Sequence, residues 1–325
     1  MLVTKTPLRI SFFGGGSDIP QFYEHNDGMV VSTSINSHIY LAINRCVANH
    51  LKVVYSEIEH VFDVNELRHD IVREALKYYG IESNIELCSF SDVTTKGTGL
   101  GSSSTFTVGL LNGLHYLKEG KPLDAKILAE LAAYIEIVRC QSPIGKQDQY
   151  AAACGGLNAI FFSKDTVRVK PIKVDATTKF ALENNLLLFN TGLQRSAKDV
   201  LSGQVNSIVS GTVAEAIKGG VNLAKHAIKL LQEKKIDDFG NLLDQAWLVK
   251  KQFASNITNP LIDEMYETAI NAGALGGKLL GAGGGGFLMM YVPYNIRSAV
   301  INAMKHHELF EFKFANYGST IEMHS

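Results

Sequence analysis

The sequence predicts an α+β protein in two lobes, and three observations support this prediction. Runs rich in β-branched and aromatic residues, such as LRISFF, MVVSTSI, HIYLAINRC and LKVVYS, dominate the first ninety residues and indicate strands. From about residue 197 to 273, apolar residues recur three and four positions apart, which indicates three or four helices. The 325 residues suffice for one large domain or for two moderate domains that share a cleft. We expect domains over residues 1–175 and 176–325, with a soft boundary because no flexible linker marks it.

The elements of the first part follow in order. A short helix is expected from Asp70 to Tyr79, and the strand NIELCSF comes after it. A turn rich in glycine and serine then runs into TFTVGLLNGLHYLKEG, which is typical of a buried helix. Asp124 can cap the next helix, AKILAELAAYIEIVRC, because its carboxylate can accept N–H groups of the first turn. Pro143 and Gly145 break the chain before a short helix at QDQYAAA.

The remaining elements complete both parts. LNAIFF and TVRVKPI indicate a hairpin, and ENNLLLFNTG indicates a further strand. The clearest helices of the second part are AIKGGVNLAKHAIKLLQEK and FGNLLDQAWLVKKQFA. The strands FLMMYV and ELFEFKFA are expected on either side of a last helix, IRSAVINAMKHH. Strands and helices therefore occur in both lobes.

Composition excludes several classes of partner. The formal net charge is -1, so no general basic field would attract nucleic acid or an anionic membrane. The N-terminus has no leader pattern, and no uncharged apolar run reaches about 18 residues. We therefore expect a cytoplasmic protein without a membrane span. The four cysteines, Cys46, Cys88, Cys140 and Cys154, form no CxxC pair and are expected to be buried free thiols. Oligomeric state is left open, a homodimer included.

The first glycine-rich segment is PLRISFFGGGSD, residues 7–18. A strand ends in Gly14, Gly15 and Gly16 and leads to Ser17 and Asp18. Consecutive glycines allow positive φ and let a ligand approach bare backbone. By itself, this segment is also compatible with an ordinary tight turn.

The second segment is KGTGLGSSSTF, residues 96–106, at the start of an apolar helix. The free N–H groups of a first helical turn and the positive end of the helix dipole attract anions. The hydroxyls of Ser102, Ser103 and Ser104 add donors, and one of them can ligate a hard cation such as Mg²⁺. The segment lacks the lysine of a Walker loop and does not fit the dinucleotide fingerprint. A serine-rich helix start without a ligand is the alternative.

The third segment is GGKLLGAGGGGF, residues 276–287. Four consecutive glycines lose much conformational entropy on folding, and a simple hairpin turn needs only one or two. We therefore expect this backbone to lie against another loop or a ligand.

Taken together, the three segments resemble the three motifs of the GHMP kinase family. PLRISFFGGGSD is similar to the first motif, GTGLGSSST to the phosphate-binding second motif and KLLGAGGGGF to the third. The resemblance extends over essentially the whole chain. It implies a GHMP kinase fold, with an N-terminal lobe resembling the second domain of ribosomal protein S5 and a C-terminal ferredoxin-like lobe. It also implies an active site in the cleft between the lobes and an ATP-dependent phosphotransferase with a sugar hydroxyl as acceptor.

The resemblance assigns roles to individual residues. Asp148, in IGKQDQYAAACGG, corresponds to the catalytic carboxylate that faces the acceptor hydroxyl, and capping of the short helix is its alternative role. Arg9 corresponds to the cation that neutralises the transferring phosphate, and a surface ion pair is its alternative. Glu136 and Ser103 correspond to the Mg²⁺ ligands, although Glu136 could instead pair with Arg139 along the helix.

The binding residues implied by the resemblance form two groups. The expected ATP-binding residues are Lys96, Gly97, Gly99, Leu100, Gly101, Ser102, Ser103 and Ser104. The expected sugar-binding residues are Gly14, Gly15, Gly16, Ser17, Asp18, Gly283 and Gly284. Asp18 is the acceptor expected for sugar hydroxyls, and a capping aspartate is its alternative role. The first motif reads GGGSD and lacks the GEH signature, which argues against galactose and mevalonate as substrates.

The substrate expected from the resemblance is a sugar phosphate. GGGSD, RCQSPIGKQDQYAAACGG and NTGLQRSAKDVL resemble the D-glycero-D-manno-heptose 7-phosphate kinase branch, and the fucokinase-related branch shares much of this pattern. A dianionic substrate needs cations in its site. Arg195 is the first candidate for the substrate phosphate, followed by Lys198 and Arg139, while Lys96 and Lys146 also lie near the motifs. The alternatives are a fucokinase-like enzyme acting at C1 of an unphosphorylated sugar and a non-catalytic sensor of sugar and ATP.

Overall fold

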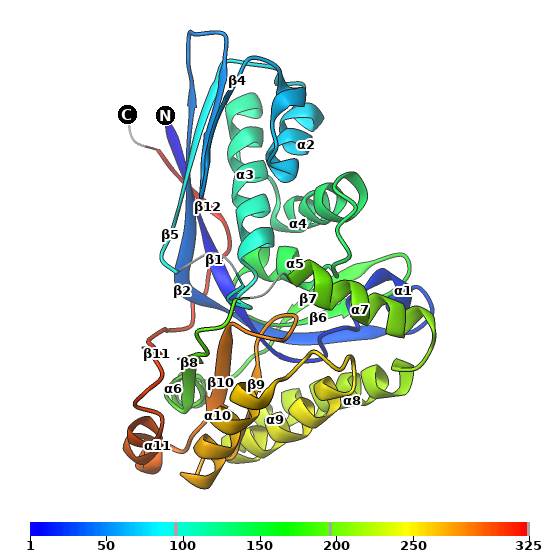
Figure 1. Cartoon of the computed structure of the whole chain (residues 1–325), viewed down its shortest axis with the longest axis vertical. Coiled ribbons are helices and arrows are strands. Elements are labelled where there is room, and N and C mark those ends of the chain that lie inside the picture. Colours follow the sequence, from blue (N-terminus) through cyan, green and yellow to red (C-terminus); the bar gives the residue numbers. More distant parts are fainter. Residues whose placement is uncertain (94–96, 195–196, 324–325) are drawn as a thin grey trace.

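The computed structural model describes residues 1–93, 97–194 and 197–323 of the chain, which form two lobes (Figure 1). The first lobe contains an eight-stranded sheet with the path β12-β1-β2-β5-β3-β4, and β6 and β7 join it through β2. Its strands are β1 (Leu2–Phe13), β2 (Gly28–Arg45), β3 (Leu51–Val54), β4 (Ile58–Val61), β5 (Ile85–Ser91), β6 (Leu157–Phe162), β7 (Val167–Pro171) and β12 (Thr320–Met323). The second lobe contains the four-stranded sheet β11-β8-β10-β9, whose strands are β8 (Leu186–Asn190), β9 (Gly276–Leu279), β10 (Phe287–Tyr291) and β11 (Leu309–Phe310).

Helices cover both sheets. The first lobe carries α2 (Asp70–Tyr79), α3 (Ser102–Glu119), α4 (Ala125–Ala133) and α5 (Gln147–Cys154), and a π-helical turn, Tyr134–Arg139, continues α4. The remaining helices are α1 (Pro20–Tyr23), α6 (Ala176–Asn184), α7 (Ala197–Val209), α8 (Ala214–Gln232), α9 (Ile236–Lys251), α10 (Pro260–Asn271) and α11 (Arg297–Ala303). The prediction of three or four helices between residues 197 and 273 is confirmed.

Strand β1 is the centre of the molecule. Residues at both alternating positions are buried from Thr6 to Phe13, although successive side chains of a strand point to opposite faces. Both faces of β1 are therefore covered, and the helices in contact with it are α3, α5, α8 and α9. Because α8 and α9 follow residue 176 in the chain and still pack on the first sheet, one hydrophobic core runs through both lobes.

The pairing of β1 with β2 is irregular at the positions that carry polar side chains. The register shifts between Pro7 and Arg9 and again between Ser11 and Phe13. Pro7 has no N–H group to contribute to the ladder, and such irregularities reorient the neighbouring side chains. The main-chain N–H of Arg9 donates instead to the carbonyl oxygen of Leu100, at 3.1 Å. This bond ties the strand to the second glycine-rich segment.

Several local predictions are confirmed. The helix predicted from Asp70 to Tyr79 has those bounds. Asp124 caps α4, because its Oδ1 accepts from the N–H groups of Lys126 and Ile127. LNAIFF and TVRVKPI pair as the hairpin β6–β7.

Other predictions were wrong. ELFEFKFA contributes only Leu309–Phe310 to a strand, because residues beyond it bond to other parts of the chain: the N–H of Lys313 donates to the Asn36 side chain and that of Phe314 to Glu183. The strand β12 was not predicted and pairs antiparallel with β1, so the last described residues belong to the first lobe. The four cysteines are free, as predicted, but each is partly exposed rather than buried. None of the helices in the described ranges is long and apolar enough to cross a membrane.

Candidate active site

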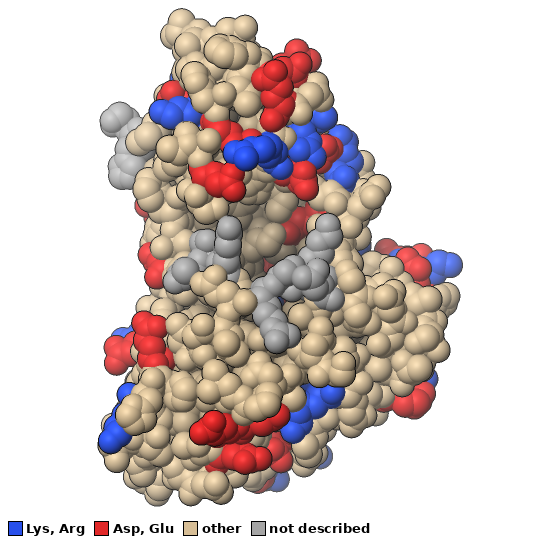
Figure 2. Space-filling view, viewed as in Figure 1, with Lys and Arg blue, Asp and Glu red and all other residues tan. Residues whose placement is uncertain are grey.

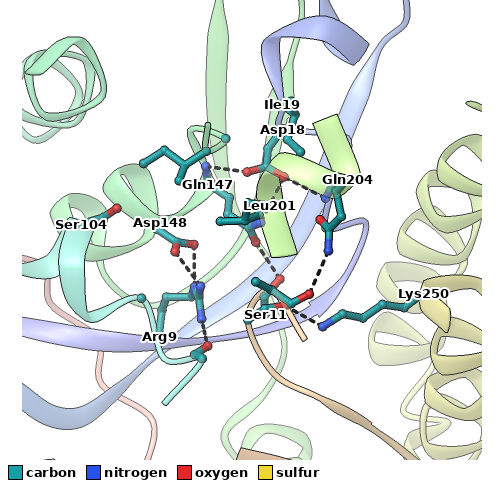
Figure 3. Close-up of a pocket in the computed structure, with 18 of the residues that line it drawn as sticks. Arg9, Ser11, Asp18, Ile19, Ser104, Gln147, Asp148, Leu201, Gln204 and Lys250 are labelled. Atoms are coloured by element: carbon teal, nitrogen blue, oxygen red, sulfur yellow. Dashed lines mark hydrogen bonds and ion pairs between the residues drawn. The ribbon is translucent and has the colours of Figure 1, made fainter. Parts of the chain in front are cut away.

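The three glycine-rich segments meet at one cavity between the lobes, with a volume of about 280 Å³. The face shown in Figure 2 is hollowed between the upper and lower lobes. Figure 3 shows the side chains that point into the cavity, from β1, α5, α7 and α9. Residues far apart in sequence are therefore brought to one site, as expected for the cleft.

The second segment forms the start of α3 and one wall of the cavity. Gly101 takes the N-cap position with φ of 79°, and no side chain caps this helix end. The N–H groups of the first turn are therefore available to an anion at the positive end of the helix dipole. The predicted residues that line the cavity here are Gly97, Gly99, Gly101, Ser102, Ser103 and Ser104. Leu100 is buried instead, and its carbonyl oxygen accepts a hydrogen bond from the main-chain N–H of Arg9.

The third segment lies directly against the second. Gly99 has φ of 77°, and a Cβ atom there would lie 2.5 Å from the carbonyl oxygen of Leu280. A Cβ atom on Gly281 would lie 2.4 Å from the Cα of Gly99. Only glycine permits such an approach of two main chains. The prediction that this backbone lies against another loop is confirmed.

Arg9 and Asp148 form a two-pronged ion pair inside the cavity. Arg9 Nε donates to Asp148 Oδ1 at 2.7 Å, and the Nη2 donates to Oδ2 at 2.6 Å. The Arg9 Nη1 donates to the carbonyl oxygen of Gly99, which fixes the guanidinium against the second segment (Figure 3). Asp148 lies in the first turn of α5, but no side chain caps that helix at its N-cap residue, Lys146. The carboxylate is thus held by Arg9, and a carboxylate retains further lone pairs for a ligand hydroxyl.

Glu136 is a buried carboxylate that points into the same cavity. Ser103 Oγ donates to its Oε1 at 3.0 Å, and Gln149 Nε2 donates to its Oε2 at 2.7 Å. Burial raises the pKa of Glu136 to about 7. Arg139 does not pair with Glu136, because the wide π turn places the two side chains on different sides of the helix. Among the described residues no cation pairs with Glu136, and a buried carboxylate beside a serine hydroxyl is a donor set that suits Mg²⁺.

Asp18 also lines the cavity, beside the glycine triplet. Its Oδ1 accepts from Gly16 N–H at 3.0 Å and from Gln147 Nε2 at 3.1 Å. Its Oδ2 accepts from the N–H of Gln147, the first residue of α5, so Asp18 also serves as a capping group from a distant segment. Burial, followed by the charge of Asp148, raises the pKa of Asp18 to about 6.

The glycine triplet itself lines the cavity, and Ser17 does not. Gly14, Gly15 and Gly16 border the cavity beside Asp18. The Ser17 hydroxyl is buried and bonds to main-chain groups of Gly14 and Met29, so it holds the loop in shape.

The cations proposed for a substrate phosphate have different positions. Arg139 pairs with Glu74 on the outside of the first lobe, with Nη2 and Oε2 2.7 Å apart, and does not line the cavity. Its surface ion pair explains why it fails to reach the site. Lys146 pairs with Glu130. Lys96, Arg195 and the side chain of Lys198 lie outside the described part of the chain.

Gly283 and Gly284 were also predicted to bind the sugar, and the structure places them outside the cavity lining. Both residues lie against the main chain of Ile257, to which Gly284 donates a hydrogen bond of 2.9 Å.

The polar residues of the cavity that were missed include Ser11, Gln147, Gln204, Lys250 and Lys278. Gln147 links Asp18 to Ser11, whose hydroxyl donates to Gln147 Oε1 at 2.8 Å. Gln204 of α7 donates to the Ala282 carbonyl. Lys250 and Lys278 are buried lysines that line the cavity. Lys250 could have been found, since it follows Ala246 and Trp247 on the apolar face of its helix, where a lysine is unusual.

Comparison with known proteins agrees with this arrangement. Residues 49–156 match the GHMP kinases N terminal domain, and residues 227–307 match the GHMP kinases C terminal domain. A D-glycero-alpha-D-manno-heptose 7-phosphate kinase of Campylobacter jejuni is 27% identical, over 97% of this chain and 97% of that protein. A bifunctional fucokinase/GDP-fucose pyrophosphorylase of Arabidopsis thaliana is 24% identical over 98% of this chain, which corresponds to 32% of that longer protein.

Solved structures share the fold. A D-glycero-D-manno-heptose 1-phosphate kinase of Bacteroides thetaiotaomicron superposes with a TM-score of 0.82 at 23% identity, with complete coverage of both chains. A galactokinase of Lactococcus lactis superposes with a TM-score of 0.74 at 19% identity, over 98% of this chain and 94% of that one. The fold, the motif matches and the geometry of the cavity agree, and the chain belongs to the GHMP kinase family of ATP-dependent phosphotransferases.

Proposed function

We propose that this kinase phosphorylates C1 of D-glycero-D-manno-heptose 7-phosphate, giving the 1,7-bisphosphate for synthesis of nucleotide-activated heptose in the cytoplasm. The observation that carries the proposed chemistry is the bidentate Arg9–Asp148 pair, which lines the same cavity as the uncapped start of α3 and Asp18. The relative from Campylobacter jejuni, similar over the full length, supports the choice of sugar.

In this proposal, the acceptor hydroxyl lies beside Asp148 and the γ-phosphoryl group of ATP lies at the start of α3. A new P–O bond forms to the sugar oxygen as the bond to ADP breaks, and the hydroxyl proton passes to a carboxylate oxygen of Asp148. Arg9 holds Asp148 in position and presents positive charge to the transferring group. Asp18 accepts hydrogen bonds from the sugar hydroxyls.

The residues that would hold Mg²⁺ are Ser103 and Glu136. Their oxygens are already 3.0 Å apart, and the metal would replace the proton that burial favours on Glu136. When bound, the ion would neutralise charge on the phosphates of ATP. ATP itself would contact the main chain of the second segment.

ADP release tests the proposal directly. Purified enzyme with ATP and Mg²⁺ should release ADP with heptose 7-phosphate much faster than with free heptose, hexose 6-phosphates or fucose. Phosphorus NMR should then show a second phosphate on the sugar, attached at C1. Turnover of the free sugar alone, without turnover of the phosphorylated one, would remove the sugar-phosphate assignment.

A fucokinase-like activity is the second candidate, because the Arabidopsis thaliana protein matches nearly the whole chain. Strong activity on fucose with none on heptose 7-phosphate would establish this candidate in place of the first.

A further inference from the structure

Two buried lysines face the cavity from the second lobe. Lys250, in the last turn of α9, and Lys278, in β9, both line it, and their exposed fractions are only 9% and 6%. Lys250 Nζ donates to the carbonyl oxygens of Leu279 and Gly281, at 2.7 and 2.6 Å. Lys278 Nζ donates to the carbonyl oxygen of Phe12, at 3.0 Å.

These bonds leave the two ammonium groups incompletely satisfied. In its protonated form a lysine has three N–H donors, so with a proton bound one donor of Lys250 and two of Lys278 remain for a ligand. Within the described ranges, no carboxylate pairs with either lysine. Their bonding partners are neutral carbonyl groups, which do not balance the charge.

Two buried lysines that both carry a proton would form an unbalanced pair of cations, which is unfavourable without an anion beside them. Burial lowers the pKa of Lys250 well below its usual value, and the charges of Lys278 and Arg9 lower it further. Burial and then the charge of Arg9 lower the pKa of Lys278 to about 7. Each lysine thus lies within reach of the positive charge of Arg9 in β1, and Lys250 also of that of Lys278. An anion between them would relieve this repulsion.

The position of the lysines indicates which anion they would bind. The start of α3 and the Ser103–Glu136 pair, which suit the phosphates of ATP, belong to the first lobe. The lysines lie on the second lobe, on a wall that they share with Gln204 and Phe253. Lys278 bonds to Phe12, just before the glycine triplet, and a Cβ atom on Gly16 would lie 3.1 Å from the Phe253 ring. This wall therefore borders the triplet beside Asp18, where the acceptor sugar is expected.

We propose that Lys250 and Lys278 bind the phosphate group that the acceptor sugar already carries. This inference rests on the proposed function, since it presumes a phosphorylated acceptor. It assigns substrate selection to a lysine pair in the second lobe, and binding of a free sugar would leave both cations without a partner.

Calorimetry on the ADP-saturated enzyme tests the assignment with two probes, heptose 7-phosphate and the unphosphorylated heptose. The wild type should bind the phosphorylated sugar at least tenfold more tightly. Lys250→Met and Lys278→Met should each reduce this preference about tenfold or more while leaving the affinity for the free sugar and for ADP within twofold. The matched control is Lys251→Met, which removes the neighbouring charge of α9, a lysine that lies over the Trp247 ring, and should keep the full preference.

Thermal unfolding separates a binding role from a structural one. Methionine removes an unbalanced buried charge, so the unliganded variants should melt at or above the wild-type temperature. A lower melting temperature together with an unchanged phosphate preference would show that the lysines only hold the glycine-rich backbone. Loss of affinity for ADP, or loss of preference only in Arg195→Ala, would equally overturn the assignment. Failure of the proposed function would give a different result: the wild-type enzyme would release no ADP with heptose 7-phosphate.

Discussion

The Asp148→Asn variant tests the centre of the proposed chemistry. Asparagine has nearly the same shape but cannot accept a proton, and its amide group would face the donors of Arg9. One of the two bonds from Arg9, now 2.7 and 2.6 Å long, would be lost, and the buried guanidinium would lose its counter-ion. We expect turnover to fall about 10²-fold or more, which corresponds to about 2.7 kcal/mol in the barrier.

The same change should lower stability by about 1–3 kcal/mol, because a charge-assisted bond to a buried group is lost. The assay is coupled ADP release under saturating substrates, with affinity for a non-hydrolysable ATP analogue measured in parallel. That affinity should stay within about threefold, because ATP is expected on the α3 loop. Asp124→Asn is the matched control: it removes one negative charge from the same lobe but keeps a good helix cap. Near-normal turnover of Asp148→Asn would show that Asp148 only positions Arg9.

Three further predictions concern the surrounding groups. Glu136→Gln should raise the Mg²⁺ concentration for half-maximal activity by roughly tenfold or more. Its melting temperature should not fall, because the substitution removes a buried carboxylate. An unchanged Mg²⁺ dependence would exclude Glu136 as a ligand. Gly99→Ala should weaken nucleotide binding, measured by calorimetry, and lower the stability by about 1–3 kcal/mol. Gly120→Ala, at a similar φ of 73° but in open space, should lower the stability less and leave nucleotide binding intact. Equal effects of the two variants would contradict the close approach of the second and third glycine-rich segments. The affinity for sugar phosphate should fall as pH rises above about 7, by at most about tenfold per pH unit. The reason is that a bound anion raises the lowered pKa of Lys278, so that binding takes up a proton. If the affinity of Lys278→Met falls with pH as steeply as that of the wild type, Lys278 is not the titrating group.

Local signals in the sequence identified much of the site. The glycine-rich segments, Asp148 and Glu136 could be found because each combines residue types that a folded core normally avoids, such as repeated glycines or a carboxylate in an apolar helix. Arg9 was assigned only through the family resemblance. Their convergence at one cavity agrees with the expectation from the family resemblance.

Contacts between distant segments account for the errors. Arg139 lies three residues from Glu136, but the π turn directs it outward to Glu74. Gln147 has no special local context and acquires its role only because Asp18 lies beside it. The final strand has little apolar character of its own and forms because the edge of β1 is open to pairing.

The sequence by itself determined the alternation of elements, the glycine-rich loops and the presence of charged groups among apolar residues, because these depend on neighbours within a few positions. Only the tertiary structure decided which charges meet. Arg9 and Asp148 are 139 positions apart, and Phe12 and Lys278 are 266 apart, yet each pair forms a hydrogen bond. Pairings of this kind depend on how two sheets and their helices pack around one strand, and local propensity carries no information about that packing.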